Sequence, residues 1–481
     1  MVARKAMQLN EESFRQCFLQ LAADINDDVT PIRVLVTLSG GPDSVALLHL
    51  VHELADREGL QVFAAHVNYG LRGQESEQDD KFCLDLCRRL DIRLFRKKAS
   101  LRKLKSANLQ DRARQVRYEF FDKLCEQYQI NLVATGHNKS DNAETMLINL
   151  FRGAGTFGLS GIKRKRGRIV RPLLDFSREE IIEFLQRQSI GYRVDSSNVK
   201  PKYLRNRVRL ELMPKIEELF GKTSLDNIAR AAGIIATQEE YLRHQADKRF
   251  RRDAHWTPFG KIVLDLKRFR GYHDISKCLM LATAFERLTG SLKDFDFAAT
   301  RRVFSCIEAG SGQVDLKAKL ICEVARNNLY IYRRSKRPAL IAVDIPGTTL
   351  LTPYGLKLTV NLPAADRIRQ EVVKKTTRKR AFLDLVSLPG KLSIRTMLPG
   401  DRFRPLGMQG SKKLSDFFID RKLERPLREE VPLLLAGGEI VWVVGQEIAE
   451  PAKVTSGSRQ IIKLEVRKLS RSPIPDEYSK S

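Results

Sequence analysis

One short stretch constrains the fold of this chain more than any other. It reads Ser39-Gly40-Gly41-Pro42-Asp43-Ser44 and lies between two apolar runs. Residues 32–38 before it are rich in β-branched side chains and too few for a helix, which predicts a buried strand. Residues 45–51 after it have apolar side chains at helical spacing. The pattern therefore predicts a strand, a tight turn and a helix.

This turn has the composition of a phosphate-binding loop. Gly40 and Gly41 permit a positive φ and let an anion approach the backbone. The helix start supplies unpaired N–H groups and the positive end of the helix dipole. Ser39 and Ser44 add hydroxyl donors, and Asp43 is placed where it could hold Mg²⁺. The alternative is an ordinary strand–helix connection. A Walker A loop is excluded, because no Lys-Ser or Lys-Thr follows the second glycine.

Strands and helices are expected to alternate after this turn, which predicts βαβ units and a parallel sheet with ligands at the carboxyl ends of its strands. A leading helix is expected at 11–23. The further strands are expected at 60–66, 93–95 and 131–135, and the helices at 76–89, 109–128, 141–151 and 178–188. Residues 150–161 are too glycine-rich for a helix, so we expect an active-site loop there.

Several candidate site residues follow the predicted strands. His66, Asn68 and Arg72 come at the end of the second strand, where a lone histidine is as often a packing residue as a ligand. Arg114 and Arg117 are three residues apart and share one helical face. That face is either a solvated basic surface or a pair of guanidinium groups that hold phosphate oxygens.

A pair of carboxylates follows Gly136-His137. Asp141 and Glu144 lie one turn apart near the start of a predicted helix, so they share one face near its positive end. Two close carboxylates repel unless a cation lies between them. Mg²⁺ carrying ATP phosphates, or a substrate ammonium, would serve. The alternative is ordinary acidic enrichment at a helix start.

Charge and cysteine content narrow the class of protein. The 481 residues contain 85 Lys and Arg against 58 Asp and Glu, a net charge of +27, which predicts a polyanionic partner such as nucleic acid. The basic runs 163–168 and 374–380 are either solvated loops or phosphate contacts. The seven cysteines include no Cys-x-x-Cys pair, so disulfides and structural zinc are not expected. Neither a membrane span nor a signal peptide is apparent, which points to the cytoplasm.

These motifs, in this order, resemble the bacterial tRNA(Ile)-lysidine synthetases of the ATP-pyrophosphatase (PP-loop) superfamily. The resemblance covers residues 30–215 and includes residues 39–44, 66–72, 113–118, 136–145, 152–155, 171–174 and 195–209. A second region of resemblance runs from Pro399 to Asp420 and includes Lys412 and Lys413.

The resemblance implies ATP-dependent ligation of free L-lysine to C2 of the wobble cytidine of a CAU-anticodon tRNA(Ile). The reaction passes through an adenylated cytidine, releases AMP and pyrophosphate, and changes decoding from AUG to AUA and identity from Met to Ile. ATP and Mg²⁺ are the implied substrate and cofactor, and a homodimer is left open. No membrane partner is implied.

The resemblance also assigns residues to roles. The implied catalytic residues are Asp43, Arg114, Asp141, Glu144 and Arg205. ATP would contact Ser39, Gly40, Gly41, Pro42, Asp43, Ser44, His66, Gly136 and His137. Mg²⁺ would lie on Asp43 and Asp141, and RNA on Arg72, Arg117, Arg152, Arg209, Lys412 and Lys413. The base that deprotonates the lysine amine is not identified.

Three positions depart from the family pattern. Ser140 stands where a second acid is common, which leaves Asp141 alone in that role. Tyr69 replaces a common histidine, and Gln446 follows Gly445 where an arginine is common. The last change puts RNA binding by that loop in doubt.

We expect an α/β Rossmann-like PP-loop domain at 30–220 after a helical lead at 1–29. A mainly helical, mixed tRNA-contacting domain would follow at 221–335. A small β-rich tRNA-binding domain at 344–470 and a tail at 471–481 would complete the chain. Two other functions stay open. An ATP-dependent tRNA thiolase would share the loop, although the absence of Cys-x-x-Cys disfavours it. A non-catalytic RNA-binding protein is disfavoured by the intact loop.

Overall fold

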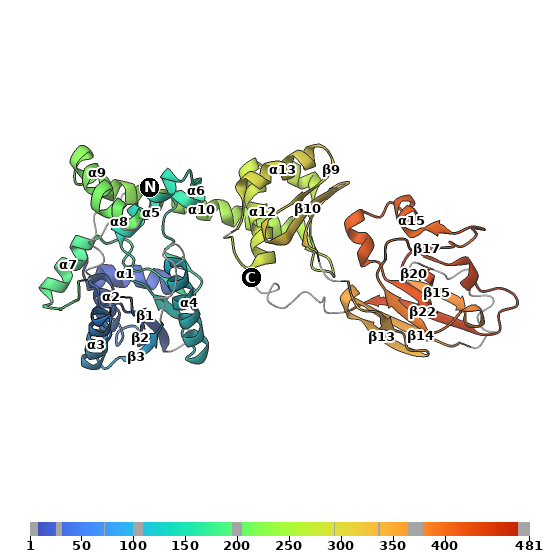
Figure 1. The fold of residues 1–481 in the computed structure, drawn as a ribbon, viewed down its shortest axis with the longest axis horizontal. Helices are drawn as coiled ribbons and strands as arrows, with labels where there is room; N and C mark the ends of the chain where they lie inside the picture. Colours follow the sequence, from blue (N-terminus) through green and yellow to red (C-terminus); the bar gives the residue numbers. More distant parts are fainter. Residues whose placement is uncertain are drawn as a thin grey trace. The chain divides into compact units, whose positions relative to one another are not determined.

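The computed structural model describes residues 8–25, 31–71, 73–99, 109–194, 204–292, 294–334, 337–363, 377 and 379–469. The chain divides into two compact units, Met1–Tyr241 and Leu242–Ser481, each described below by itself (Figure 1). The division falls inside one long helix, α10 (Ser224–Asp253). The domain limits predicted from the sequence stay predictions.

The first unit is built on a six-stranded sheet in the order β3-β2-β1-β4-β6-β5. All neighbouring strands run parallel except β5, which is antiparallel to β6. The strands are β1 (Ile32–Thr37), β2 (Leu60–Asn68), β3 (Arg93–Lys98), β4 (Leu132–Ala134), β5 (Lys165–Arg166) and β6 (Ile169–Val170). The parallel α/β sheet predicted from the alternating pattern is confirmed.

Helices cover both faces of this sheet. Val34 and Val36 of β1 pack into a core with α1, α2, α3 and α7, whereas Leu35 packs into a second core with α4. Alternate residues of a strand point to opposite faces, so the continuous apolar run of β1 serves two cores at once. The helices are α1 (Glu11–Ala22), α2 (Pro42–Glu53), α3 (Gln74–Arg89), α4 (Leu109–Gln127), α5 (Lys139–Phe151) and α7 (Arg178–Arg187).

One prediction for this unit is wrong in part. Residues 150–161 do not form a loop throughout, because α5 runs to Phe151 and a helical turn, α6, spans Thr156–Leu159. Gly155 is the extended N-cap residue of α6, and Gly158 is required inside it, since a Cβ there would lie 2.4 Å from that of Ala154. The glycines here allow a tight helical turn rather than prevent one.

After α7 the described chain resumes as a helical segment with an irregular middle. α8 (Leu204–Arg207) passes into a π-helical turn (Val208–Leu212) and then into α9 (Met213–Phe220). Its apolar residues pack against α5, with Val208 and Met213 buried beside Leu147. Short π turns inside helices are often found at functional sites, because they change the direction in which side chains point.

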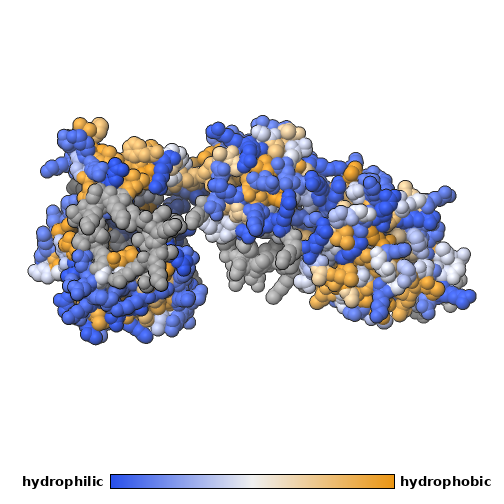
Figure 2. Space-filling view, viewed as in Figure 1, coloured by the Kyte–Doolittle hydropathy of each residue, from blue (hydrophilic) through white to orange (hydrophobic). Residues whose placement is uncertain are grey.

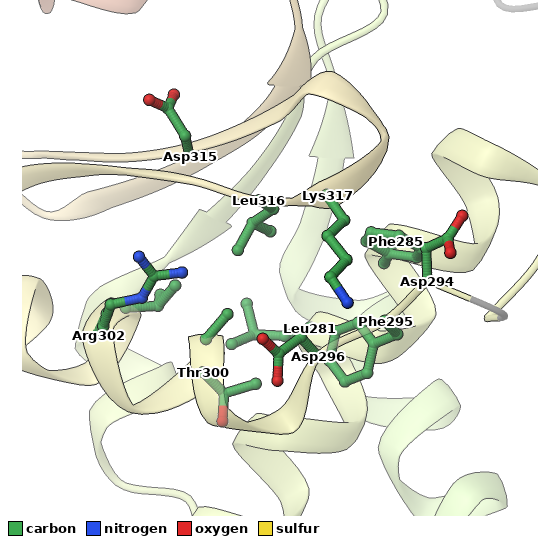
Figure 3. Close-up of a pocket in the computed structure, with 12 residues that line it drawn as sticks. Leu281, Phe285, Asp294, Phe295, Asp296, Thr300, Arg302, Asp315, Leu316 and Lys317 are labelled. Atoms are coloured by element: carbon green, nitrogen blue, oxygen red, sulfur yellow. The ribbon is translucent and has the colours of Figure 1, made fainter.

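The second unit begins with a five-stranded sheet in the order β7-β8-β11-β10-β9, all antiparallel. Its elements are β7 (Ala254–Trp256), β8 (Ile262–Asp265), α11 (Leu266–Arg270), α12 (Asp274–Thr289), α13 (Phe297–Glu308), β9 (Ser311–Asp315), β10 (Leu320–Ala325) and β11 (Asn328–Arg333). A cavity of about 280 Å³ lies between α12, α13 and the turn after β9, where Phe285, Phe295 and Lys317 line it (Figure 3). No residue assigned to a role from the sequence lines this cavity.

The rest of this unit is rich in short antiparallel strands, as predicted. The larger sheets have the orders β12-β16-β19-β20-β21 and β13-β14-β22-β15, and β17 pairs with β18. The described strands are β12 (Ile341–Ala342), β13 (Gly347–Leu351), β14 (Leu356–Asn361), β15 (Arg380–Asp384), β16 (Leu392–Arg395), β17 (Arg402–Phe403), β18 (Lys412–Lys413), β19 (Leu433–Ala436), β20 (Glu439–Val443), β21 (Glu447–Ile448) and β22 (Ile461–Lys468), and helix α15 spans Leu414–Asp420.

Hydrophilic side chains cover much of the visible surface of each unit, with smaller hydrophobic areas between them (Figure 2). Within the described ranges, no helix has the length and apolar character needed to cross a membrane.

Candidate active site

The predicted phosphate loop lies between the carboxyl end of β1 and the start of α2. Gly40 has a φ of +87°, which glycine adopts without strain, and Gly41 is the extended N-cap residue. The Ser44 hydroxyl accepts the N–H of Ser39 at 3.1 Å and donates to the carbonyl of Gly41 at 3.0 Å. No side chain caps the first turn of α2. Its N–H groups are therefore available to an anion.

A second loop packs directly against the first. A Cβ at Gly136 would lie 3.1 Å from the backbone carbon and oxygen of Asp43 and 3.2 Å from the N–H nitrogen of Ser44. Asn138, the N-cap residue of α5, donates its side-chain N–H to Asp43 Oδ1 at 2.8 Å. A Cβ at position 136 would thus require a shift of the neighbouring backbone by a few tenths of an ångström, and the asparagine fixes the Asp43 carboxylate.

Asp43 stands out among the acids of this site because no salt bridge to it exists among the described residues. Burial raises the pKa of its carboxyl group, the Asn138 hydrogen bond lowers it, and the negative charge of Asp141 raises it again. The net shift is upward, so the structure disfavours the charged form of Asp43. A cation beside it would stabilise its charged form, and Mg²⁺ prefers such oxygen ligands.

Asp141 and Glu144 lie side by side, as their spacing predicts, and two arginines compensate their charges. Arg205 reaches Asp141 Oδ1 at 3.1 Å and Glu144 Oε2 at 2.7 Å. Arg209 reaches the same Asp141 oxygen at 2.9 Å and Glu144 Oε1 at 2.5 Å. The Glu144 side chain is fully buried, and Asp141 Oδ2 accepts the backbone N–H of Asn138 at 3.1 Å. Arg205 lies in α8 and Arg209 in the π turn that follows it, and both side chains reach the same pair of acids.

The sequence predicted that a cation lies between Asp141 and Glu144. The two carboxylates do share a cation, but in this structure it is a pair of guanidinium groups from the protein itself. A role for Asp141 in binding Mg²⁺ or for Glu144 in facing a substrate ammonium stays a prediction. The described residues contain no cluster of three or more metal-ligating side chains.

Two arginines of α4 add positive charge to the site. Arg114 lies over the ring of Tyr118 at 5.3 Å, and Arg117 donates to the hydroxyl of Tyr69 at 3.1 Å. Neither arginine has a salt bridge among the described residues. Tyr69 in turn donates to the carbonyl of Ala113 at 3.1 Å, so this departure from the family pattern has a structural role.

Comparisons with known proteins agree with this geometry. A model of the PP-loop domain matches residues 10–216, and a model of the TilS substrate C-terminal domain matches residues 392–465. The chain is 30% identical over 448 residues to a tRNA(Ile)-lysidine synthase of Clostridium tetani, covering 90% of this chain and 94% of that protein. It belongs to the tRNA(Ile)-lysidine synthase family.

Other relatives and a solved structure were found as well. The chain is 33% identical over 460 residues to a tRNA(Ile)-lysidine synthase of Symbiobacterium thermophilum, covering 91% of this chain and 94% of that protein. A crystal structure of a TilS C-terminal domain covers 28% of this chain and 98% of its own, at 24% identity and a TM-score of 0.25. The predicted family, the fold class and an ATP-dependent tRNA-modifying ligase are confirmed.

Two histidines of this chain were predicted to contact ATP. His66 is 5% exposed, and its Nδ1 lies 2.9 Å from the carbonyl of Leu38, directly before the phosphate loop. A carbonyl only accepts, so Nδ1 carries the proton, and His66 supports the base of the loop. His137 has its Nδ1 2.9 Å from the Thr135 hydroxyl, and burial lowers its pKa to about 4. Their contacts with ATP stay predictions.

The predicted RNA contacts are distributed over both units. Arg152 is exposed and directly follows α5, whereas Lys412 and Lys413 form β18 in the second unit, where Lys412 pairs with Asp420. Arg209 belongs to the ion-pair network described above. Arg72 and most of the basic run 374–380 lie outside the described residues.

The basic run 163–168 is partly neutralised by acids from distant segments. Lys163 pairs with Glu239 at 3.4 Å, and Arg164 forms a salt bridge with Asp175. Lys165 pairs with Asp24 at 2.9 Å. These ion pairs hold the run against the rest of the first unit, so these three side chains are not simply solvated. Contact of the run with phosphate stays a prediction.

Two residues of the site were not assigned a role from the sequence. Asn138 directly follows Gly136-His137, and its identity as an N-cap residue was the available signal. Arg171 begins the Arg171-Pro172-Leu173-Leu174 motif and lies directly after β6, at the edge of the sheet where the other site residues gather. A motif directly after a parallel strand was the available signal for it.

Proposed function

We propose that this chain ligates free L-lysine to C2 of the wobble cytidine of a CAU-anticodon tRNA(Ile). Membership of the lysidine synthase family along 90% of the chain is the observation that carries this proposal. The phosphate loop, its uncapped helix start and Asp43, which has no salt bridge among the described residues, support the use of ATP in it.

The proposed chemistry has two steps. The cytosine O2 attacks the α-phosphorus of ATP, and the bond to pyrophosphate breaks, which turns a poor leaving group into an adenylate. The lysine ε-amine then attacks C2, and AMP leaves with the oxygen. The amine loses a proton in this step, so a base must accept it.

Residues of the first unit would divide the work between them. The N–H groups of the Ser39–Ser44 loop would hold the phosphates that leave as pyrophosphate. Asp43 would hold Mg²⁺, which supplies charge compensation for the triphosphate when it is bound. Arg114 would stabilise charge on the α-phosphate as it develops, since it has no carboxylate partner among the described residues.

Glu144 has a different role in this proposal. It is fully buried and bonds to both Arg205 and Arg209. We assign to it the positioning of these two guanidinium groups, which then present their remaining N–H donors to AMP or to RNA. Asp141, at 16% exposure, is the acid of this pair that a substrate ammonium could approach.

The first step can be tested alone by leaving lysine out. The full chain is incubated with tRNA(Ile) transcript, Mg²⁺ and ATP labelled at the α-phosphate. We expect label on the tRNA and one pyrophosphate released for each label. Asp43→Ala should abolish both, and normal adenylation by that variant would refute the metal assignment. If sulfur from a sulfur donor enters the tRNA instead of lysine, the thiolase alternative is correct.

A further inference from the structure

Arg171 is a buried cation without an acid. Its side chain is 5% exposed, and no carboxylate of the described residues forms a salt bridge with it. Nη1 donates to the backbone carbonyl of Lys163 at 2.5 Å, whereas the buried Nε has no hydrogen-bond partner. A buried donor left unsatisfied costs free energy, and a buried charge left unpaired costs more.

Arg171 lies at the edge of the sheet where the other site residues are, so its unsatisfied donor is placed where a ligand could bind. It directly follows β6, whose Val170 carbonyl accepts the N–H of Thr135 at 3.0 Å, so it lies beside the Gly136-His137 turn. That is the carboxyl edge of the sheet, where the phosphate loop also lies. Arg205 and Arg209 at this edge are bonded to acids, whereas Arg171 is buried and has no acid partner among the described residues.

The neighbours of Arg171 are cationic or neutral. Burial lowers the pKa of its guanidinium, Tyr118 raises it, in part through a side-chain hydrogen bond, and the positive charges of Arg114 and Arg166 lower it. Arg114 is exposed and has no salt bridge among the described residues. Arg114 lies over the ring of Tyr118 at 5.3 Å, so both guanidinium groups adjoin this tyrosine, and an anion between them would remove their mutual repulsion.

We propose that Arg171 forms the buried half of a phosphate-binding site whose exposed half is Arg114. The free Nε–H of Arg171 would donate to a phosphate oxygen, and Arg114 would contact the same group from the solvent side. This site is separate from the Ser39–Ser44 loop, which uses backbone N–H groups. The phosphate belongs either to ATP or to the RNA backbone, because both present the same oxygens.

The inference rests on the proposed function only for the identity of these two ligands. Its test measures binding without turnover, so a failure of lysine transfer would leave its result unaffected. The variants are Arg171→Met, which removes the charge at similar length, and Arg171→Lys, which keeps it. Arg33→Met is the matched control, because Arg33 Nη1 also donates to a backbone carbonyl, that of Tyr128, near the amino end of β1.

Three quantities are measured on the full chain: the dissociation constant for ATP without tRNA, that for tRNA(Ile) transcript without ATP, and the thermal midpoint without ligand. We expect Arg171→Met to weaken the binding of one of the two ligands by about tenfold or more. The affinity of Arg171→Lys should lie between those of Arg171→Met and the unmodified chain. A loss confined to ATP assigns the site to the nucleotide. A loss confined to tRNA, with a salt slope smaller by about one, assigns it to the RNA backbone.

The thermal midpoint separates binding from support of the fold. Removing an unpaired buried charge should leave the midpoint of the ligand-free protein unchanged or raise it, because the ligand that would compensate the charge is absent. A structural arginine would instead lower the midpoint when removed. Unchanged affinity for both ligands, or a lower midpoint with both affinities reduced together, would overturn the proposal.

Discussion

The ion-pair network around Glu144 makes a quantitative prediction. Glu144→Gln keeps the shape of the side chain but removes its charge, and its amide NH₂ group would face a guanidinium donor. Breaking a buried pair from one side costs about 3–5 kcal/mol. The Arg205 and Arg209 side chains are 41% and 29% exposed, and both retain their ion pairs with Asp141 in the variant. Solvent and this second acid therefore reduce the cost of the substitution. We expect a loss of about 2–3 kcal/mol.

That loss is large enough to measure as a change in thermal stability. For a folding unit of 150–250 residues, 1 kcal/mol shifts the midpoint by about 2–4 °C, so the variant should unfold about 5–10 °C earlier. Calorimetry on the full chain measures it in the transition that ATP shifts upward. Glu211→Gln is the matched control, because Glu211 lies in the same segment in an exposed pair with Arg207 and should cost under about 0.5 kcal/mol. Equal midpoints for the two variants would refute the reasoning.

Three other predictions concern the phosphate loop and its neighbours. Asp43→Asn should reduce adenylation at least about a hundredfold, yet raise the thermal midpoint at neutral pH. The folded-state pKa of Asp43 is raised, so the unmodified chain loses stability as pH rises through that pKa, and the variant does not. Equal midpoints for the variant and the unmodified chain at neutral pH would contradict this. Gly136→Ala should weaken ATP binding about tenfold or more in a titration, whereas Gly191→Ala, with open space around its Cβ, should not. His137 should titrate near pH 4 by NMR, so its contribution to the stability of the fold is present above about pH 6.5 and is lost as pH falls toward 4. A titration midpoint near pH 6.5 would be inconsistent with its burial.

Much of the first unit could be predicted because its local patterns are strong. The apolar run before Ser39 and the glycines after it predicted β1, the turn and α2. The helices at 109–128 and 178–188 were predicted to within one residue at each end. Cys83 and Cys87, one helical turn apart, are both buried in the core, as buried thiols on a core-facing helix would be.

The chemistry of the site was less predictable, because it depends on contacts between distant segments. Arg205 and Glu144 are 61 residues apart, and Asn138 and Asp43 are 95 apart. Spacing within a helix shows that two acids share a face, but it does not show which cation lies between them. The isolation of Arg171 is a property of everything that surrounds it, so only the fold could reveal it.

Lysine transfer to the wobble cytidine is measured by following labelled lysine itself. The full chain is incubated with ATP, Mg²⁺, radiolabelled L-lysine and a CAU-anticodon tRNA(Ile) transcript, and the RNA is then digested to nucleotides. We predict label in the wobble nucleotide of tRNA(Ile) and none in the methionine tRNA, with one AMP formed for each lysine. Tight tRNA binding without any transfer of lysine would contradict the account.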